Sequence, residues 1–160
     1  MKTAICYATN TGTTKECAEL LKKQLSDAVL CNIESEKITL SNYDCIVIGG
    51  CIRMGKLHKA ASKFIADNKT ILMEKKCAFY ICNGFPEQTE AFLVQNIDKE
   101  LLSHSVCAAT FGGKMDLDKL KGIEKFIAKA VGNTMKNDPA KIPQILPDNI
   151  KQFAETLNNI

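Results

Sequence analysis

Five short apolar segments recur along the chain, and each is followed by a turn and then by a helical pattern or a loop. These predicted strands are Thr3–Ala8, Val29–Ile33, Tyr43–Ile48, Lys76–Cys82 and Val106–Phe111. Near-continuous apolar runs such as Tyr43–Ile48 are typical of strands buried on both faces of a parallel sheet. Right-handed crossovers then place helices on both faces. The sequence therefore predicts an α/β fold, a doubly wound sheet of five parallel strands.

Helical patterns fill the intervals between the predicted strands. The apolar spacing predicts helices over Thr14–Leu25, His58–Asn68, Pro86–Leu102, Leu117–Val131 and Asp148–Leu157. The apolar positions of the third of these helices are Ala91, Phe92, Ile97, Leu101 and Leu102. No repeat, low-complexity tract or linker divides the 160 residues, so we expect a single domain, 1–160.

Charge and hydropathy exclude several classes of protein. The formal net charge of +3 is too small to indicate a nucleic-acid partner. No apolar run approaches the ~18 residues that a membrane-spanning helix needs. Polar Thr9, Asn10 and Thr11 follow the apolar start at once, unlike the core of a signal peptide. We therefore expect a soluble, cytoplasmic protein without a stable membrane anchor.

The chain contains eight cysteines but no C-x-x-C pair and only two histidines. Most of the cysteines fall within apolar-periodic segments, where a free thiol behaves as a small hydrophobic side chain. A zinc site is therefore disfavoured, and no metal site is predicted. Structural thiols are the favoured interpretation, and a redox-active thiol is the alternative.

Ligands of open parallel sheets bind beyond the carboxyl ends of the strands, so the loops there carry the candidate site. The first loop holds hydroxyl side chains at four positions around one glycine, in the order Thr9, Asn10, Thr11, Gly12, Thr13, Thr14. Hydroxyls, backbone N–H groups and the positive end of a helix suit a phosphate. The absence of a Walker lysine disfavours a nucleoside triphosphate. The alternative is a threonine-rich helix cap and turn.

The string Thr9-x-Thr11-Gly12-x-Thr14, placed between a strand and a helix, resembles the phosphate loop of the flavodoxin family. The resemblance extends over almost the whole chain. The segment Ile48–Ala60 is similar to the branch that includes menaquinone-dependent protoporphyrinogen oxidase. The resemblance implies the flavodoxin strand order 2-1-3-4-5 and flavin mononucleotide (FMN) as a noncovalent cofactor. It also implies that the first loop binds the FMN phosphate.

In this resemblance the other three loops surround the flavin ring. The residues implied as cofactor-binding are Cys51, Ile52, Arg53, Met54 and Gly55 in the second loop, Cys82, Asn83, Gly84 and Phe85 in the third, and Gly112 and Gly113 in the fourth. Glycines permit close approach of a flat ligand, here at Gly50 and Gly55. Asn83 and Gly84 suit a tight turn with positive φ. Met54 or Arg53 can pack on an aromatic face.

Two residues of these loops have open alternatives. Arg53 either raises the potential of the second flavin electron or is a surface residue paired with a carboxylate. His58 either makes a polar contact near the flavin or is an ordinary residue at a helix start. Direct contact of Lys114 with the cofactor is the less favoured alternative for that residue.

Compared with acidic electron-carrier flavodoxins, this chain is weakly basic, with Arg53, Lys56, Lys59 and Lys114 near the expected flavin rim. The oxidase branch carries a basic insert after the fourth strand, whereas residues 83–90 here lead directly into a helix. We therefore predict an electron carrier that moves one or two electrons between a redox protein donor and an acceptor. The alternative is a protoporphyrinogen oxidase-like or quinone-linked FMN oxidoreductase.

Overall fold

The computed structural model describes residues 1–114 and 143–160. The predicted helix Leu117–Val131 lies outside the described residues. The five long strands are β1 (Thr3–Tyr7), β2 (Ala28–Asn32), β3 (Cys45–Arg53), β5 (Lys76–Cys82) and β6 (Cys107–Thr110). They are parallel and lie in the order β2-β1-β3-β5-β6, which confirms the predicted order of the five strands. A two-residue strand, β4 (Lys56–Leu57), pairs antiparallel with the end of β3.

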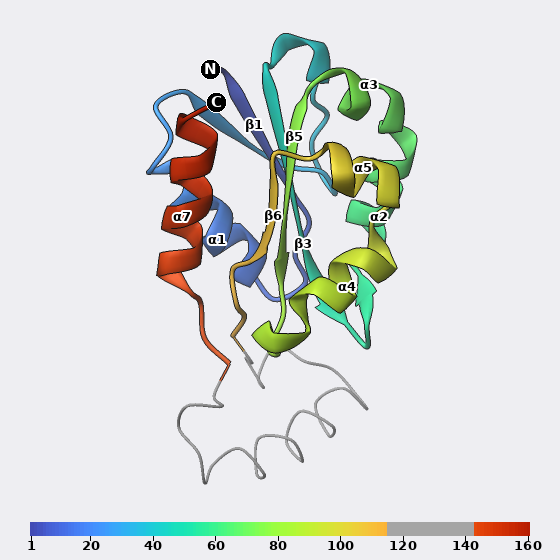
Figure 1. Cartoon of the computed structure of the whole chain (residues 1–160), viewed down its shortest axis with the longest axis vertical. Helices are drawn as coiled ribbons and strands as arrows, with labels where there is room; N and C mark the ends of the chain where they lie inside the picture. The colour runs from blue at the N-terminus through green and yellow to red at the C-terminus, as the bar shows by residue number, and fades with distance from the viewer. Residues whose placement is uncertain (115–142) are drawn as a thin grey trace, which may run out of the picture.

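Helices cover both faces of the sheet, as predicted (Figure 1). One face carries α1 (Thr13–Lys22) and α7 (Pro147–Asn158). The other carries α2 (Lys59–Asp67), α3 (Lys69–Glu74), α4 (Thr89–Asn96) and α5 (Lys99–His104). Two 3-10 turns, Leu40–Asn42 and Pro86–Gln88, lie in the connections. Among the described helices, none is long and apolar enough to cross a membrane.

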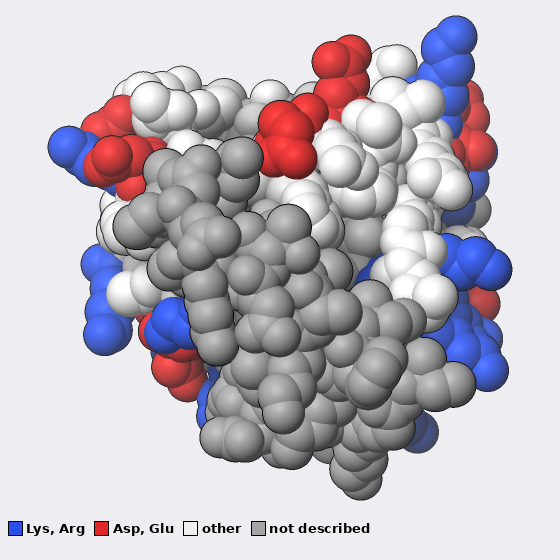
Figure 2. Space-filling model, turned by 90° about the horizontal axis from the view of Figure 1, so that it is seen from below, with Lys and Arg blue, Asp and Glu red and all other residues white. Residues whose placement is uncertain are grey.

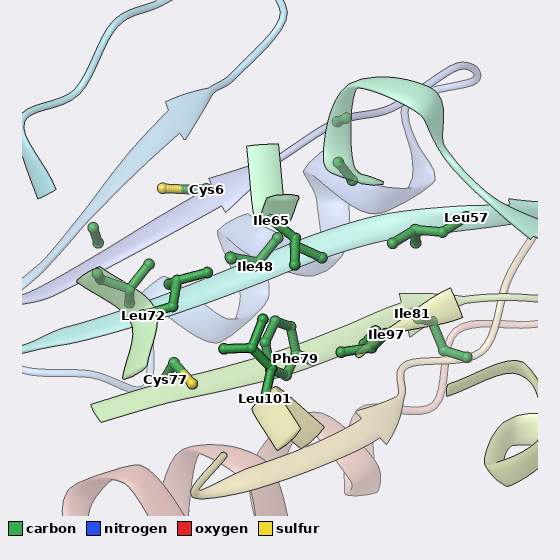
Figure 3. Close-up of a cluster of buried hydrophobic side chains, with 14 of the residues drawn as sticks. Cys6, Ile48, Leu57, Ile65, Leu72, Cys77, Phe79, Ile81, Ile97 and Leu101 are labelled. Atoms are coloured by element: carbon green, nitrogen blue, oxygen red, sulfur yellow. The ribbon is translucent and has the colours of Figure 1, made fainter. Parts of the chain in front are cut away.

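Each face of the sheet buries its own apolar cluster. Figure 3 shows the cluster under α2–α5, where Phe79 of β5 lies among Ile48, Ile97 and Leu101. On the opposite face the Tyr80 and Phe111 rings stack with centroids 4.4 Å apart. The Phe153 ring of α7 meets Phe111 edge-on. The side chains of β5 therefore alternate between two closed cores, which explains its apolar sequence.

The predicted end of the third strand at Ile48 is wrong at Gly49 and Gly50. They lie inside β3, which continues to Arg53. A Cβ atom on Gly49 would lie 1.9 Å from Cζ of Tyr80, so the glycine makes room for a buried ring. A Cβ atom on Gly50 would meet Leu57 and Ala61, so the space beside Gly50 is taken by the protein itself.

The predicted helix Pro86–Leu102 is also interrupted. Ile97 has an extended backbone, and the chain restarts as α5 at an Asp98 cap whose carboxylate accepts from Glu100 N–H and Leu101 N–H. Ile97 and Leu101 are buried, as predicted, but Ala91 is exposed. The Asp98 cap and the burial of Ile97 therefore outweigh the local helical pattern.

Candidate functional site

A cavity of about 520 Å³ opens beyond the carboxyl ends of the strands. This volume lies within the ~300–1,000 Å³ typical of small-molecule sites. Residues from all four predicted loops line it, namely Asn10, Thr11, Thr13, Cys51, Ile52, Arg53, Met54, Gly55, Cys82, Asn83, Gly84, Phe85 and Gly113. Four other predicted residues, Thr9, Gly12, Thr14 and Gly112, lie outside the lining. Parallel topology thus brings segments far apart in sequence to one cavity.

The first loop joins β1 to α1 through Gly12, whose φ of 96° is left-handed and suits glycine. Thr9 Oγ1 accepts a hydrogen bond from Gly12 N–H at 3.0 Å. No side chain caps α1, so its first N–H groups face the loop without a side-chain acceptor in the described part of the chain. Thr14 is buried beneath the loop and does not border the cavity. Uncapped N–H groups at the start of a helix fit a phosphate.

Asn10 connects this loop to the second one. Its Oδ1 lies 3.1 Å from Nε2 of His58, and its Nδ2 donates to Cys51 Sγ at 3.5 Å. His58 Nδ1 accepts from Ala60 N–H, which places the imidazole proton on Nε2 in the neutral ring and makes Nε2 the donor to Asn10. His58 is therefore a helix-start residue that caps α2 and also contacts the first loop, and its contact with the flavin stays a prediction.

A carboxylate also reaches the first loop. Glu34 Oε2 accepts from Thr9 N–H at 3.2 Å, and Glu34 Oε1 lies 3.6 Å from His58 Nε2. The sequence analysis did not identify Glu34, because nothing in the segment after β2 marks it as close to β1. An anion bound at this loop would meet one negative charge at its edge.

The second loop is a hairpin between β3 and β4 with Met54 and Gly55 at its tip. Both have positive φ, 50° and 76°. A two-residue turn of this kind matches the strand twist but strains a residue with a Cβ atom. Asn96 of α4 holds the hairpin, donating to Gly55 O at 2.9 Å and accepting from Leu57 N–H at 2.8 Å. The side chain of Met54 is 84% exposed at the cavity rim.

Asn83 organises the third and fourth loops. Its Oδ1 accepts from Phe85 N–H at 2.8 Å, and its Nδ2 donates to Thr110 Oγ1 at 3.2 Å. Neither Asn83 nor Gly84 has a positive φ, so that prediction is wrong; the side-chain hydrogen bond makes the turn instead. The two loops then run close together, and Asn83 N–H donates to Gly112 O.

The glycines of the fourth loop accommodate the protein's own backbone. A Cβ atom on Gly112, at φ 73°, would lie 2.1 Å from Gln144 O. A Cβ atom on Gly113 would lie 2.9 Å from Asn83 O. Gly112 therefore serves the packing of the segment before α7, whereas Gly113 both packs on Asn83 and lines the cavity.

Charges of both signs border the site. Lys114 lines the cavity and pairs with Glu16 of α1 at 2.7 Å. Seen from the cavity end, acidic and basic side chains both lie around the edge of the molecule (Figure 2).

Burial raises the pKa of the Cys51 thiol, which lines the cavity. Within 1–114 and 143–160, no group of three or more His, Cys, Asp or Glu side chains is arranged to hold a metal ion.

Four further lining residues lay outside the predicted site set: Gln88, Phe92, Lys114 and Pro143. Phe92 was predicted as an apolar position of a helix, which indicates only that its side chain faces the core. Pro143 is distant in sequence from every other lining residue, since even Lys114 lies 29 residues before it. Only the return of the chain toward α7 brings it to the cavity.

Comparison with known families gives one match that covers most of the chain. A family model described as a flavodoxin domain matches residues 4–141. Protoporphyrinogen IX dehydrogenase [quinone] of Escherichia coli strain K12 is 36% identical over 88 residues. That alignment covers 52% of this chain and 49% of the E. coli protein. The chain thus matches about half the length of this relative.

Several solved structures share the fold. A flavoprotein of Lactobacillus acidophilus in complex with FMN gives a TM-score of 0.55 at 17% identity, over 68% of this chain and 92% of that one. Two-electron reduced flavodoxin of Megasphaera elsdenii gives 0.53 at 18% identity, over 68% and 84%. The Streptococcus pneumoniae flavodoxin gives 0.52 at 17% identity, over 99% of both chains. At these low sequence identities the comparisons show a shared fold and nothing more.

Proposed function

This chain belongs to the flavodoxin family, and we propose that it binds FMN in the cavity at the carboxyl ends of its strands. The observation that carries the proposal is the uncapped start of α1 at the cavity, whose wall includes Thr11 and Thr13. A phosphate would supply acceptors for the first N–H groups of this helix. FMN is also bound in the Lactobacillus acidophilus structure that shares this fold.

In this proposal the first loop, residues 9–14, binds the phosphate through backbone N–H groups and hydroxyls. The hairpin at Met54 and the turn at Asn83 would flank the flavin ring, because both line the cavity after the carboxyl ends of the neighbouring strands β3 and β5. Bound FMN would supply one- and two-electron redox chemistry. The protein would position the cofactor through the four loops that line the cavity.

We further propose that the protein is an electron carrier between a redox protein donor and an acceptor. The cavity opens to the surface, and Met54 and Phe85 expose apolar side chains at its rim. Exposed apolar groups with mixed charges around them suit transient docking of a second protein. The connection from β5 to the following 3-10 turn consists of Asn83, Gly84 and Phe85, which leaves no room for an insert there.

The cofactor proposal is tested by titrating the purified apoprotein into FMN and following flavin fluorescence. Riboflavin, which lacks the phosphate, is the matched control ligand. We expect FMN to bind at least tenfold more tightly than riboflavin. Equal affinities would contradict a phosphate site in the first loop, and an absence of binding by FMN would contradict the cofactor.

The second candidate function is oxidation of protoporphyrinogen coupled to a quinone. The 36% identity to the E. coli protoporphyrinogen IX dehydrogenase favours it, although the alignment spans about half of that protein. Incubation of the FMN-loaded protein with protoporphyrinogen and a menaquinone analogue separates the two candidates. Turnover well above that of free FMN supports the dehydrogenase; turnover equal to the free-FMN blank supports the carrier.

A further inference from the structure

Three cysteine thiols lie on the α1 side of the sheet, beneath the first loop. Cys17 projects from α1, and Cys51 and Cys82 are register partners near the carboxyl ends of β3 and β5. Cys17 and Cys82 are in direct contact, with 3.7 Å between their Sγ atoms. Both are buried, at 0% and 3% exposure. Two thiols that are 65 residues apart in sequence therefore meet under the loop that enters α1.

Position distinguishes this pair from the other cysteines. Cys82 lines the cavity, so one sulfur-bearing residue of the pair borders the space in which a ligand would lie. Cys6 and Cys31 are also neighbours, in register on β1 and β2, but neither lines the cavity. Cys45 and Cys77 lie near the amino ends of β3 and β5, whereas the cavity lies beyond the carboxyl ends.

We propose that Cys17 and Cys82 form a redox-active dithiol, which oxidises to an intramolecular disulfide and passes its two electrons to oxidised FMN. This proposal rests on the proposed cofactor for its electron acceptor. Two S–H bonds break and one S–S bond forms. The two electrons and two protons go to FMN, which becomes the fully reduced flavin. In the reverse direction, reduced FMN opens the disulfide to two thiols.

Forming the disulfide requires the two sulfurs to move together and one thiol to ionise. Their Sγ atoms must approach from 3.7 Å to ~2.05 Å. The adjacent Cys17 thiol and burial hold the pKa of Cys82 well above its usual value. The thiol therefore stays mostly protonated, and because the thiolate is the reactive form, oxidation of this buried pair by FMN or by an added oxidant is slow.

The first experiment needs no flavin. The full chain is reduced, freed of reductant under anaerobic conditions and treated with the thiol oxidant diamide, and its thiols are counted after denaturation. We expect the count to fall from eight to six, with a linked peptide pair containing Cys17 and Cys82. Cys17→Ser and Cys82→Ser should lose this product, whereas the matched control Cys107→Ser should keep it. A different pairing, or no pairing, in the folded protein would overturn the proposal.

The second experiment adds one equivalent of FMN to the reduced protein without oxygen or any other oxidant. The visible absorbance of oxidised flavin should decline in step with the loss of two thiols. The reverse reaction, opening of the preformed disulfide by reduced FMN, is measured as well, so that an unfavourable equilibrium in one direction does not hide the exchange. Bound FMN that exchanges electrons in neither direction would overturn the electron transfer. A diamide-formed Cys17–Cys82 disulfide in a protein that does not bind FMN would refute the cofactor proposal and leave the dithiol itself supported.

Discussion

His58 and Asn10 are joined by a hydrogen bond of 3.1 Å across 48 residues of sequence. His58 belongs to the start of α2, whose first turn it caps, and Asn10 belongs to the loop after β1. Through Asn10 Nδ2 the contact continues to Cys51 of β3. The loop proposed for the phosphate and the segment proposed for the flavin ring are therefore held together by side chains before any ligand is present.

Replacing His58 tests this connection. In His58→Ala the loop loses its hydrogen bond to the imidazole, worth about 1 kcal/mol, so FMN affinity should fall roughly fivefold. Loss of the cap on α2 should also lower the free energy of unfolding by about 1 kcal/mol. Fluorescence titration and thermal unfolding measure the two effects. Lys59→Ala, on the exposed neighbour, is the control, and an equal loss of affinity in both variants would contradict the role of His58.

Glu34 is expected to oppose the binding of a phosphate. Its carboxylate accepts from Thr9 N–H at the first loop, where a dianion would be repelled. Glu34→Gln keeps an acceptor for this N–H and removes the charge, so FMN affinity should rise roughly threefold to tenfold. The gain should shrink at high salt. Glu100→Gln on α5 makes the same change of net charge far from the site, and a similar gain there would show a nonspecific charge effect.

Gly49 should tolerate no side chain. A Cβ atom there would overlap the Tyr80 ring, whose hydroxyl donates to Thr14 O, so neither partner can move freely. We expect Gly49→Ala to lower the free energy of unfolding by about 3 kcal/mol through overpacking. Gly12→Ala is the contrast, since no atom lies within 4 Å of its Cβ and only the positive φ opposes it, at about 1–2 kcal/mol. Urea unfolding of both variants measures the difference; a milder effect at Gly49 than at Gly12 would be inconsistent with this packing.

Buried thiols should make the fold sensitive to alkali. Burial raises the pKa of Cys45 and Cys107 to about 12, and that of Cys77 to about 11. A folded-state pKa above the unfolded value of about 8.5 means that the unfolded chain loses its protons first. The stabilisation is complete below about pH 8.5 and is lost as the pH rises toward 11–12. Thermal unfolding from pH 8 to 11 should show this decline, and Cys77→Ala should flatten it; an unchanged slope would contradict the assignment.

Replacing Arg53 tests whether this residue raises the reduction potential of a bound flavin. The residue lines the cavity at the end of β3, and a guanidinium there would stabilise an anionic reduced flavin. Arg53→Gln should lower the potential of the second electron by tens of millivolts and change the first less. A redox titration of the FMN-loaded protein measures both potentials. Lys63→Gln, an exposed lysine of α2 paired with Asp67, is the control for net charge, and equal potentials in Arg53→Gln and the unaltered protein would contradict the role of Arg53.

The fold was readable from local patterns. The five strands and the helices α1, α2 and α7 were predicted within a few residues apart from the end of β3, because each buries an apolar stripe that its own segment encodes. The resemblance of the loop Thr9–Thr14 to a flavodoxin phosphate loop supplied the strand order and the family. The loops of the candidate site followed from this order, since parallel strands place all their carboxyl ends at one edge.

The contacts between the loops were decided only by the tertiary structure. Glycine in a sequence does not reveal what will approach it, so the predicted third strand stops before Gly49 although this glycine lies inside β3 and accommodates Tyr80. Glu34, Asn96 and the meeting of Cys17 with Cys82 depend on segments that become neighbours only after the sheet has formed. Apolar periodicity records which face of an element is buried. It carries no information on which distant side chain completes a hydrogen bond or touches a sulfur atom, because that partner is set by the packing of the whole chain.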